Sequence, residues 1–268
     1  MINPRFRPSP ARLLLVIGAA CAVLFIVLPF IGLATRTPWG HFIDHIGSPN
    51  AQTALWLSIG TSLASTLVCI ALGVPIAWLL ARHQFPLRGL VRAVVTVPMV
   101  LPPVVAGAAL LAVFGRGSGF IGRVLFNTFD TQLTFSPLGV IVAQSFVALP
   151  FFVIAAETGI AAVDKRFELV ASTLGGTPTF VALAVTLRLA LPALVAGAVL
   201  AWARAFGEFG ATITFAGNIE GRTQTLPLSV YMLLESDPNA AFALSVVMVA
   251  VAIVVLVLLR GRYLGRSR

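Results

Sequence analysis

The sequence has few charged residues for its length. Only 10% of its 268 residues are charged and 59% are hydrophobic, whereas soluble domains are about 25% charged. The low charge excludes a soluble enzyme. The high hydrophobicity excludes a disordered chain, because disorder requires few apolar residues. An integral membrane protein is the class that remains.

Cysteine, histidine and lysine are also scarce. The two cysteines, Cys21 and Cys69, lie deep in apolar stretches, which argues against a disulfide framework and a Cys-X-X-Cys site. His41 and His45 stand four residues apart, but two ligands do not make a metal site. The single lysine, Lys165, does not follow a glycine as in a nucleotide-binding P-loop. We therefore expect no catalytic, cofactor or metal site in this chain.

Six apolar segments reach the length of a membrane span, which is about 20 residues. The first follows basic residues, as a signal peptide would, but its apolar core is longer and no clear cleavage site follows it, so we expect it to be retained. We predict an all-α polytopic membrane protein of about six transmembrane helices in a single domain, 1–268. The predicted spans are 12–34, 53–81, 91–114, 137–160, 187–215 and 240–259.

The basic residues indicate the orientation of these spans. One alternating set of loops, with both ends of the chain, holds most of the 18 basic residues. Because cytoplasmic loops are enriched in Lys and Arg, we place this set, and both termini, in the cytoplasm. Basic clusters that alternate with apolar runs also favour a lipid bilayer over a nucleic acid as partner. The inner set is Arg5, Arg7, Arg12, Arg82, Arg88, Arg92, Lys165, Arg166, Arg188, Arg260, Arg262, Arg266 and Arg268, and the outer set is Arg36, Arg116, Arg123 and Arg222.

Prolines crowd the start of the third predicted span. Pro98, Pro102 and Pro103 would each remove a backbone hydrogen bond from a continuous helix. Inside a bilayer, a broken helix is tolerated only where it is buried in protein or lines a wet cavity. These prolines therefore indicate either an ordinary kink or a span that lines a transport pathway.

Two charges lie deep within the fifth predicted span, away from its ends. Arg204 and Glu208 are four residues apart, so their side chains would meet on one helix face. An isolated charge at this depth costs at least about 2.5–3.5 kcal/mol, and pairing lowers that cost. The pair either fixes helix packing or belongs to a hinge or gate beside Gly207 and Gly210.

A polar segment, 161–180, separates the fourth and fifth spans on the predicted cytoplasmic side. It predicts a short helix that ends at a glycine pair beginning with Gly175. A surface helix with an apolar stripe packs either on its own bundle or in the groove of a partner. The residues at three-to-four spacing on its apolar side are Phe167, Val170, Ala171 and Leu174.

Three stretches carry a family resemblance. Residues 206–218, continued through 225–227, are similar to the signature of the molybdate permeases, and residues 100–105 are a further likeness. The cytoplasmic segment resembles the Glu-Ala-Ala loop of permease subunits in ATP-binding-cassette importers, with Gly175 at the motif glycine. The motif glutamate would fall at Leu169, one place after Glu168.

The resemblance implies a type I importer permease fold in the bacterial inner membrane. Two copies would pair, two ATPase subunits would dock beneath them, and an extracytoplasmic binding protein would deliver molybdate. ATP and its magnesium would be bound by the ATPase. The coupling residues would be Phe167, Glu168, Val170, Ala171, Leu174 and Gly175, the gate region Arg204, Gly207, Glu208 and Gly210, and the pathway-lining residues Pro98, Pro102 and Pro103.

Substrate and energy source remain open to alternatives. Tungstate shares the shape and charge of molybdate, and sulfate is the near relative. A secondary anion transporter would need ion-coupling carboxylates inside its spans, where Glu208 stands beside a cation. A membrane scaffold without transport would explain neither the coupling-like helix nor the broken span.

Overall fold

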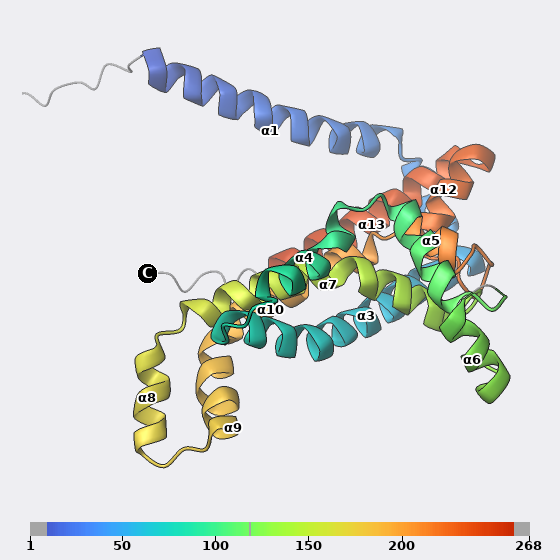
Figure 1. The fold of residues 1–268 in the computed structure, drawn as a ribbon. Coiled ribbons are helices and arrows are strands. Elements are labelled where there is room, and N and C mark those ends of the chain that lie inside the picture. Colours follow the sequence, from blue (N-terminus) through green and yellow to red (C-terminus); the bar gives the residue numbers. More distant parts are fainter. Residues whose placement is uncertain (1–9, 118, 260–268) are drawn as a thin grey trace, which may run out of the picture.

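A computed structural model describes residues 10–117 and 119–259, and the described residues form helices and loops without a β-strand (Figure 1). In chain order the helices are α1 (Pro10–Arg36), η1 (Trp39–His41), α2 (Phe42–Gly47), α3 (Pro49–Arg82), α4 (Arg88–Val100), α5 (Pro103–Phe114), α6 (Phe120–Phe129), α7 (Pro137–Ala162), α8 (Lys165–Thr173), α9 (Pro178–Phe180), η2 (Val181–Thr186), α10 (Leu187–Phe206), α11 (Gly210–Phe215), α12 (Leu226–Ser236) and α13 (Pro238–Leu259). The fold is all-α, as the sequence predicts.

Within the described residues, five helical runs are long and apolar enough to cross a membrane, and the bent pair α4–α5 makes a sixth when it is counted as one span. The five are Arg12–Arg36, Pro49–Arg82, Pro137–Ala162, Pro178–Phe206 and Pro238–Val255. This number agrees with the predicted count of about six. The basic residues at positions 5, 7, 260, 262, 266 and 268, which entered the orientation, lie outside the described residues.

The third and fifth predicted spans are both interrupted. Between α4 and α5 the axis bends by 117°, which is much more than an ordinary proline kink. The fifth helical run begins at Pro178, upstream of the predicted start, and ends at Phe206. The remainder of the predicted fifth span forms the separate helix α11. The bend between α4 and α5 and the separate helix α11 could not be predicted from hydropathy. Hydropathy detects how long an apolar segment is, but it does not detect where the backbone changes direction.

Helices α3, α7 and α10 pack together as the core of the bundle. Small residues lie at their crossings, with Gly73 of α3 against Phe152 of α7 and Gly159 of α7 against Ala193 of α10. Because lipid is as apolar as a protein interior, helices in membranes associate mainly through such close packing. Phe152 is fully buried at the centre of this core.

Polar contacts also join these helices. Oγ of Ser65 lies 3.1 Å from the carbonyl oxygen of Ile141 and 3.1 Å from Oε1 of Gln144. The hydroxyl of Ser58 accepts a hydrogen bond of 2.6 Å from the backbone of Leu226. Since buried polar groups need partners, these contacts fix the register of α3 against α7 and α12. The recurrence of serine along α3 is the sequence signal that could have predicted them.

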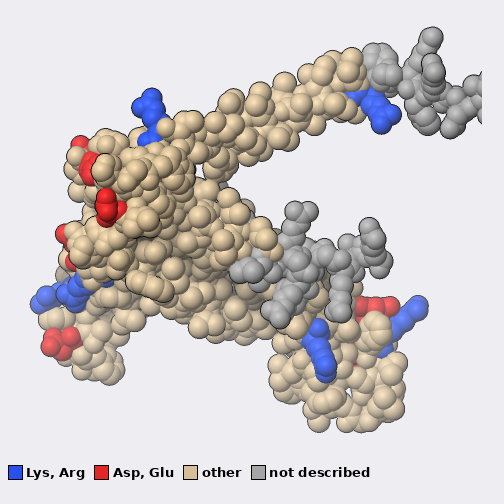
Figure 2. Space-filling model, turned by 180° about the vertical axis from the view of Figure 1, so that it is seen from behind, with Lys and Arg blue, Asp and Glu red and all other residues tan. Residues whose placement is uncertain are grey.

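Helix α1 leaves the bundle and extends beside it as a separate rod (Figure 1). Its apolar span is 0% buried within this chain, and it packs on α13. On the face shown in Figure 2, charged side chains gather toward the extremities of the molecule, and the body between them is uncharged. This distribution suits a bilayer, because charges at the hydrocarbon centre are costly.

Candidate functional site

The predicted cytoplasmic segment folds as the nine-residue helix α8. Asp164 caps its start by accepting a hydrogen bond of 2.9 Å from the backbone of Arg166. At its end the N–H of Gly176 donates to the carbonyl of Ala171 at 2.9 Å. Gly175 has a φ of +88°, a left-handed conformation that favours glycine. The helix and its glycine ending therefore both follow the sequence pattern.

One side of α8 presents apolar side chains to solvent. Phe167 is 56% exposed, Val170 is 58% exposed and Leu174 is 83% exposed; Ala171 is partly buried. In Figure 1, α8 and the following α9 project together from the end of the bundle. The apolar stripe is thus not covered by the described part of the chain, which favours the partner-groove interpretation.

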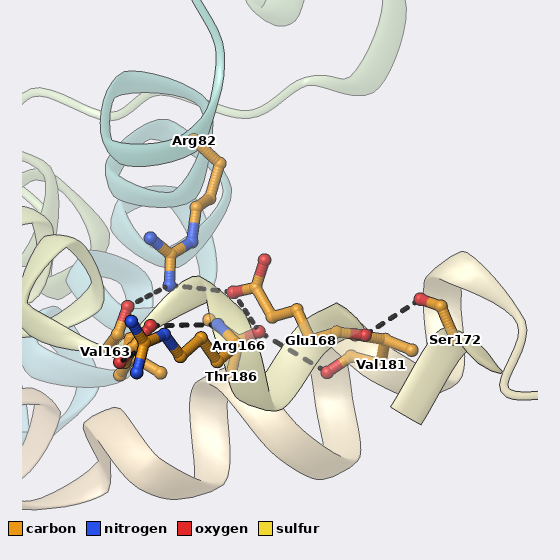
Figure 3. Close-up of polar contacts among 8 residues, drawn as sticks. Arg82, Val163, Arg166, Glu168, Ser172, Val181 and Thr186 are labelled. Atoms are coloured by element: carbon orange, nitrogen blue, oxygen red, sulfur yellow. Dashed lines mark hydrogen bonds and ion pairs between the residues drawn. The ribbon is translucent and has the colours of Figure 1, made fainter. Parts of the chain in front are cut away.

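Glu168 points in the other direction, toward the bundle (Figure 3). Its Oε1 lies 2.7 Å from Nη2 of Arg82, the last residue of α3. The same oxygen accepts a hydrogen bond of 2.7 Å from Oγ1 of Thr186, at the end of η2. The family resemblance groups Glu168 with the coupling residues, but its side chain turns toward the bundle, away from the exposed apolar side chains of α8. Arg82 and Thr186 are functional candidates that the sequence did not single out.

The Arg204–Glu208 pair spans a break between two helices. Helix α10 ends at Phe206 with Gly207 as its C-cap, and Glu208 stands before α11. Nη1 of Arg204 lies 2.5 Å from Oε2 of Glu208, whose side chain is 1% exposed. Oε1 of Glu208 accepts a hydrogen bond of 2.8 Å from the backbone of Ala211.

The two side chains meet, as the sequence predicts, but they do not lie on one continuous helix. The spacing of four residues suits an unbroken helix, but Gly207 ends α10 before Glu208 is reached. The carboxylate instead caps the first turn of α11, where a negative charge is favourable. The ion pair consequently ties the end of one helix to the start of the next.

The two broken helices lie against each other. A Cβ built on Gly107 of α5 would lie 2.6 Å from Cβ of Thr214 in α11, so these helices approach closely. Pro102 precedes α5 and Pro103 is its first residue, where a proline costs no helix hydrogen bond. Pro98 is buried inside α4 and is not at the break. The junction brings together Pro103 and the glycine region of the fifth span.

A further ion pair joins α4 to α7. Glu157 pairs with Arg92, and its Oε1 lies 4.0 Å from Nη2 of Arg88. These side chains line a cavity of about 540 Å³. In the sequence, Arg88 and Arg92 serve only as basic residues that indicate the orientation of the spans. Their contact with Glu157 could not be predicted, because it joins parts of the chain that are far apart in sequence.

Metal ligands do not gather in the described part of the chain. Among residues 10–117 and 119–259, no group of three or more His, Cys, Asp or Glu side chains could hold a metal ion. His41 contacts Asp44 through Nδ1 at 3.4 Å, and both side chains are mostly exposed.

The comparison with known protein families shows which family this chain belongs to. A family model described as the binding-protein-dependent transport system inner membrane component matches residues 73–266, which include α8 and both helix breaks. The chain belongs to this family. As an inner-membrane component it is a multi-pass permease of the ATP-binding-cassette importer type.

Individual relatives of this permease are similar over most of its length. It is 46% identical over 237 residues to the molybdenum transport system permease protein ModB of Mycobacterium tuberculosis, which covers 88% of this chain and 89% of the relative. It is 38% identical to the Escherichia coli ModB, over 80% of this chain and 93% of that one. It is also 32% identical to the sulfate transport system permease protein CysT of Salmonella typhimurium, over 87% and 85%.

Solved structures agree on the fold. A chain of a bacterial transporter for the import of alginate matches this permease with a TM-score of 0.76 and 17% identity, over 95% of this chain and 96% of that one. A chain of the MetNI methionine transporter, solved in inward-facing conformations, matches with a TM-score of 0.63 and 16% identity, over 80% and 95%. The helix arrangement is therefore that of importer permeases.

Proposed function

We propose that this permease is the membrane-spanning subunit of an ATP-driven importer that carries molybdate into the cytoplasm. The observation that carries the proposal is the 46% identity to a molybdenum transport permease over 88% of the chain. Molybdate is a dianion, and a charged solute needs a gated aqueous path through hydrocarbon. Tungstate has the same shape and charge and is expected to follow the same path.

Sulfate is the second candidate substrate. The 32% identity to a sulfate permease favours it, although more weakly than the molybdenum relatives favour molybdate. Near the helix breaks the permease offers Arg204, which Glu208 already neutralises. A path of this kind binds dianions weakly, so we assign the choice among oxyanions to a separate binding protein on the outer side.

We assign energy coupling to α8. Phe167, Val170 and Leu174 form an exposed apolar ridge that suits a hydrophobic groove of a second protein. Ala171 lies beside the ridge, and Gly175 lets the chain turn back toward the bundle. In this proposal the groove belongs to an ATP-binding-cassette ATPase, which also binds ATP and magnesium.

We assign the pathway to the junction of the two broken helices. Broken backbone at membrane depth occurs where it is buried in protein or borders a wet cavity. The helices break after α4 and after α10, and in this proposal both breaks border the pathway. Pro102 and Pro103 lie at one break, and Gly207 and Gly210 at the other, while Pro98 lies in the approach through α4. ATP binding would draw two coupling helices together and open this junction outward, and product release would return it.

The complete transporter would contain two copies of this permease and two ATPase subunits, with a molybdate-binding protein at the outer side. The exposed apolar surface of α1 supports pairing, since a helix that packs so little on its own chain is available to lipid or to a second copy. The two-fold arrangement would place a coupling helix on each ATPase.

The substrate assignment is tested by reconstitution with the candidate ATPase and binding protein in proteoliposomes. We expect molybdate-loaded binding protein to stimulate ATP hydrolysis more than the sulfate-loaded form. Stronger stimulation by sulfate would move the assignment to sulfate. Hydrolysis that no loaded binding protein stimulates would contradict an importer of this kind.

A further inference from the structure

Arg82, Glu168 and Thr186 form one hydrogen-bonded group, which we call the Glu168 latch (Figure 3). Oε1 of Glu168 lies 2.7 Å from both Nη2 of Arg82 and Oγ1 of Thr186. The side chain of Arg82 is 8% exposed and that of Glu168 is 24% exposed, and Thr186 is buried. A single carboxylate oxygen thus joins the end of α3, the helix α8 and the end of η2.

The latch attaches a helix that has little other support. Helix α8 has nine residues, none of them buried, and an isolated helix of that length is marginal in water. Short loops, 163–164 and 174–177, connect it to the bundle. Its orientation therefore depends on the latch and on its packing against η2.

Thr186, one of the two partners of Glu168, ends an irregular helix. Residues Val181–Thr186 form a π-helix between α9 and α10. Such wide turns are rare and occur frequently at functional sites. Thr186 ends η2 immediately before α10 begins, so a displacement of Glu168 would be transmitted to the start of α10. Through the ion pair with Arg82 it would also be transmitted to the end of α3.

We propose that the Glu168 latch is the positioning device that makes α8, α3 and α10 move as one body when an ATPase displaces α8. This inference rests on the proposed function. Without the latch, rotation at loops 163–164 and 174–177 would absorb the displacement of α8. ATP would then be hydrolysed while the pathway remained in one state.

Both donors of the latch have a second acceptor inside the bundle. Nη2 of Arg82 also donates to the carbonyl of Val163 at 3.0 Å. Oγ1 of Thr186 lies 3.4 Å from the carbonyl oxygen of Val181. Removal of the Glu168 carboxylate therefore leaves each donor with a hydrogen-bond acceptor. It also leaves the charge of Arg82 without its counter-ion, so we expect the variant to be less stable than the unaltered protein. We expect Glu168→Ala to insert and to assemble with the ATPase.

The test uses the complete transporter in proteoliposomes with molybdate-loaded binding protein. It compares Glu168→Ala and Arg82→Gln with the unaltered complex by molybdate imported, ATP hydrolysed and ATPase retained on purification. We expect import per ATP to fall at least about fivefold, the lower end of typical coupling effects, while the retained ATPase is unchanged. The double variant should be no worse than the worse single variant, because both changes remove the same contact.

Thr186 and Arg188 offer matched variants. Thr186→Val removes the hydroxyl at nearly constant shape and should lower import per ATP, whereas Thr186→Ser should restore it. Arg188 is an exposed arginine two residues further along the chain. Arg188→Gln removes the same charge as Arg82→Gln and should leave the ratio unchanged.

Three outcomes would overturn the inference in distinguishable ways. An unchanged ratio of import to ATP in Glu168→Ala would overturn the latch and leave the importer intact. Loss of bound ATPase in Glu168→Ala but not in Arg82→Gln would show that Glu168 contacts the ATPase directly. Failure of the unaltered complex to import with ATP would overturn the proposed function, and the latch with it.

Discussion

Pro103 and Gly210 lie in contact where the two broken helices meet. A Cβ built on Gly210 would lie 2.6 Å from Cβ of Pro103, closer than Cβ atoms approach in folded proteins. Pro103 begins α5 and Gly210 begins α11. The two helix starts are thus packed with no room for a methyl group, at the junction to which the pathway is assigned.

The first prediction concerns this contact. Gly210→Ala should force α5 and α11 apart, at a cost of about 1–3 kcal/mol for overpacking. We expect molybdate uptake to fall while the protein still inserts and retains its ATPase. Gly60→Ala is the matched control, since nothing lies within 4 Å of a Cβ at Gly60. Normal uptake by Gly210→Ala would show that the close contact between α5 and α11 is not needed for transport.

The second prediction concerns Arg204 and Glu208. Removing one partner of a buried ion pair costs about 3–5 kcal/mol, because the remaining charge is left uncompensated. Glu208 is 1% exposed. We therefore expect Arg204→Ala and Glu208→Ala each to lower thermal stability and uptake more than the double change to alanine does. Thermal unfolding and uptake of the three variants measure this. Additive losses would show that the two charges do not act as a pair.

The third prediction separates backbone conformation from crowding at Gly175. Nothing lies within 4 Å of a Cβ at this position, but its φ is +88°. A left-handed residue other than glycine costs about 1–2 kcal/mol, less for asparagine and more for β-branched side chains. We expect Gly175→Val to lose ATPase binding and uptake, and Gly175→Asn to retain most of both. Equal loss in the two variants would indicate that the ATPase requires close approach to this glycine.

The fourth prediction tests the exposed ridge of α8. Ala171→Glu places a charge beside Phe167, Val170 and Leu174, which an apolar groove would have to desolvate. We expect the variant to insert normally and to lose the ATPase on purification, with uptake lost in consequence. Full ATPase retention and normal uptake would show that this face is not the docking face.

The sequence predicts those features that depend on local pattern. Apolar length predicts the number of spans, and the residues around Gly175 predict a short helix with a glycine ending, because a left-handed turn has its own local signal. The proline cluster predicts that the third span is disturbed, although its bend of 117° needs the structure.

Contacts between distant segments could not be predicted in this way. Glu168 meets Arg82 and Thr186 only because α3 and η2 end beside α8. The spacing of Arg204 and Glu208 is equally compatible with one helix and with a break between two. The carboxylate of Glu208 caps α11, and that role depends on where Gly207 ends the preceding helix.

The central claim is that this permease is a conduit driven by a separate ATPase, and uptake by proteoliposomes tests it most directly. Vesicles containing the permease alone are compared with vesicles containing the permease and ATPase, with molybdate-loaded binding protein outside and ATP inside. We predict molybdate accumulation only where both ATPase and ATP are present. Uptake by the permease alone at the rate of the full complex would contradict the account and would favour a secondary transporter.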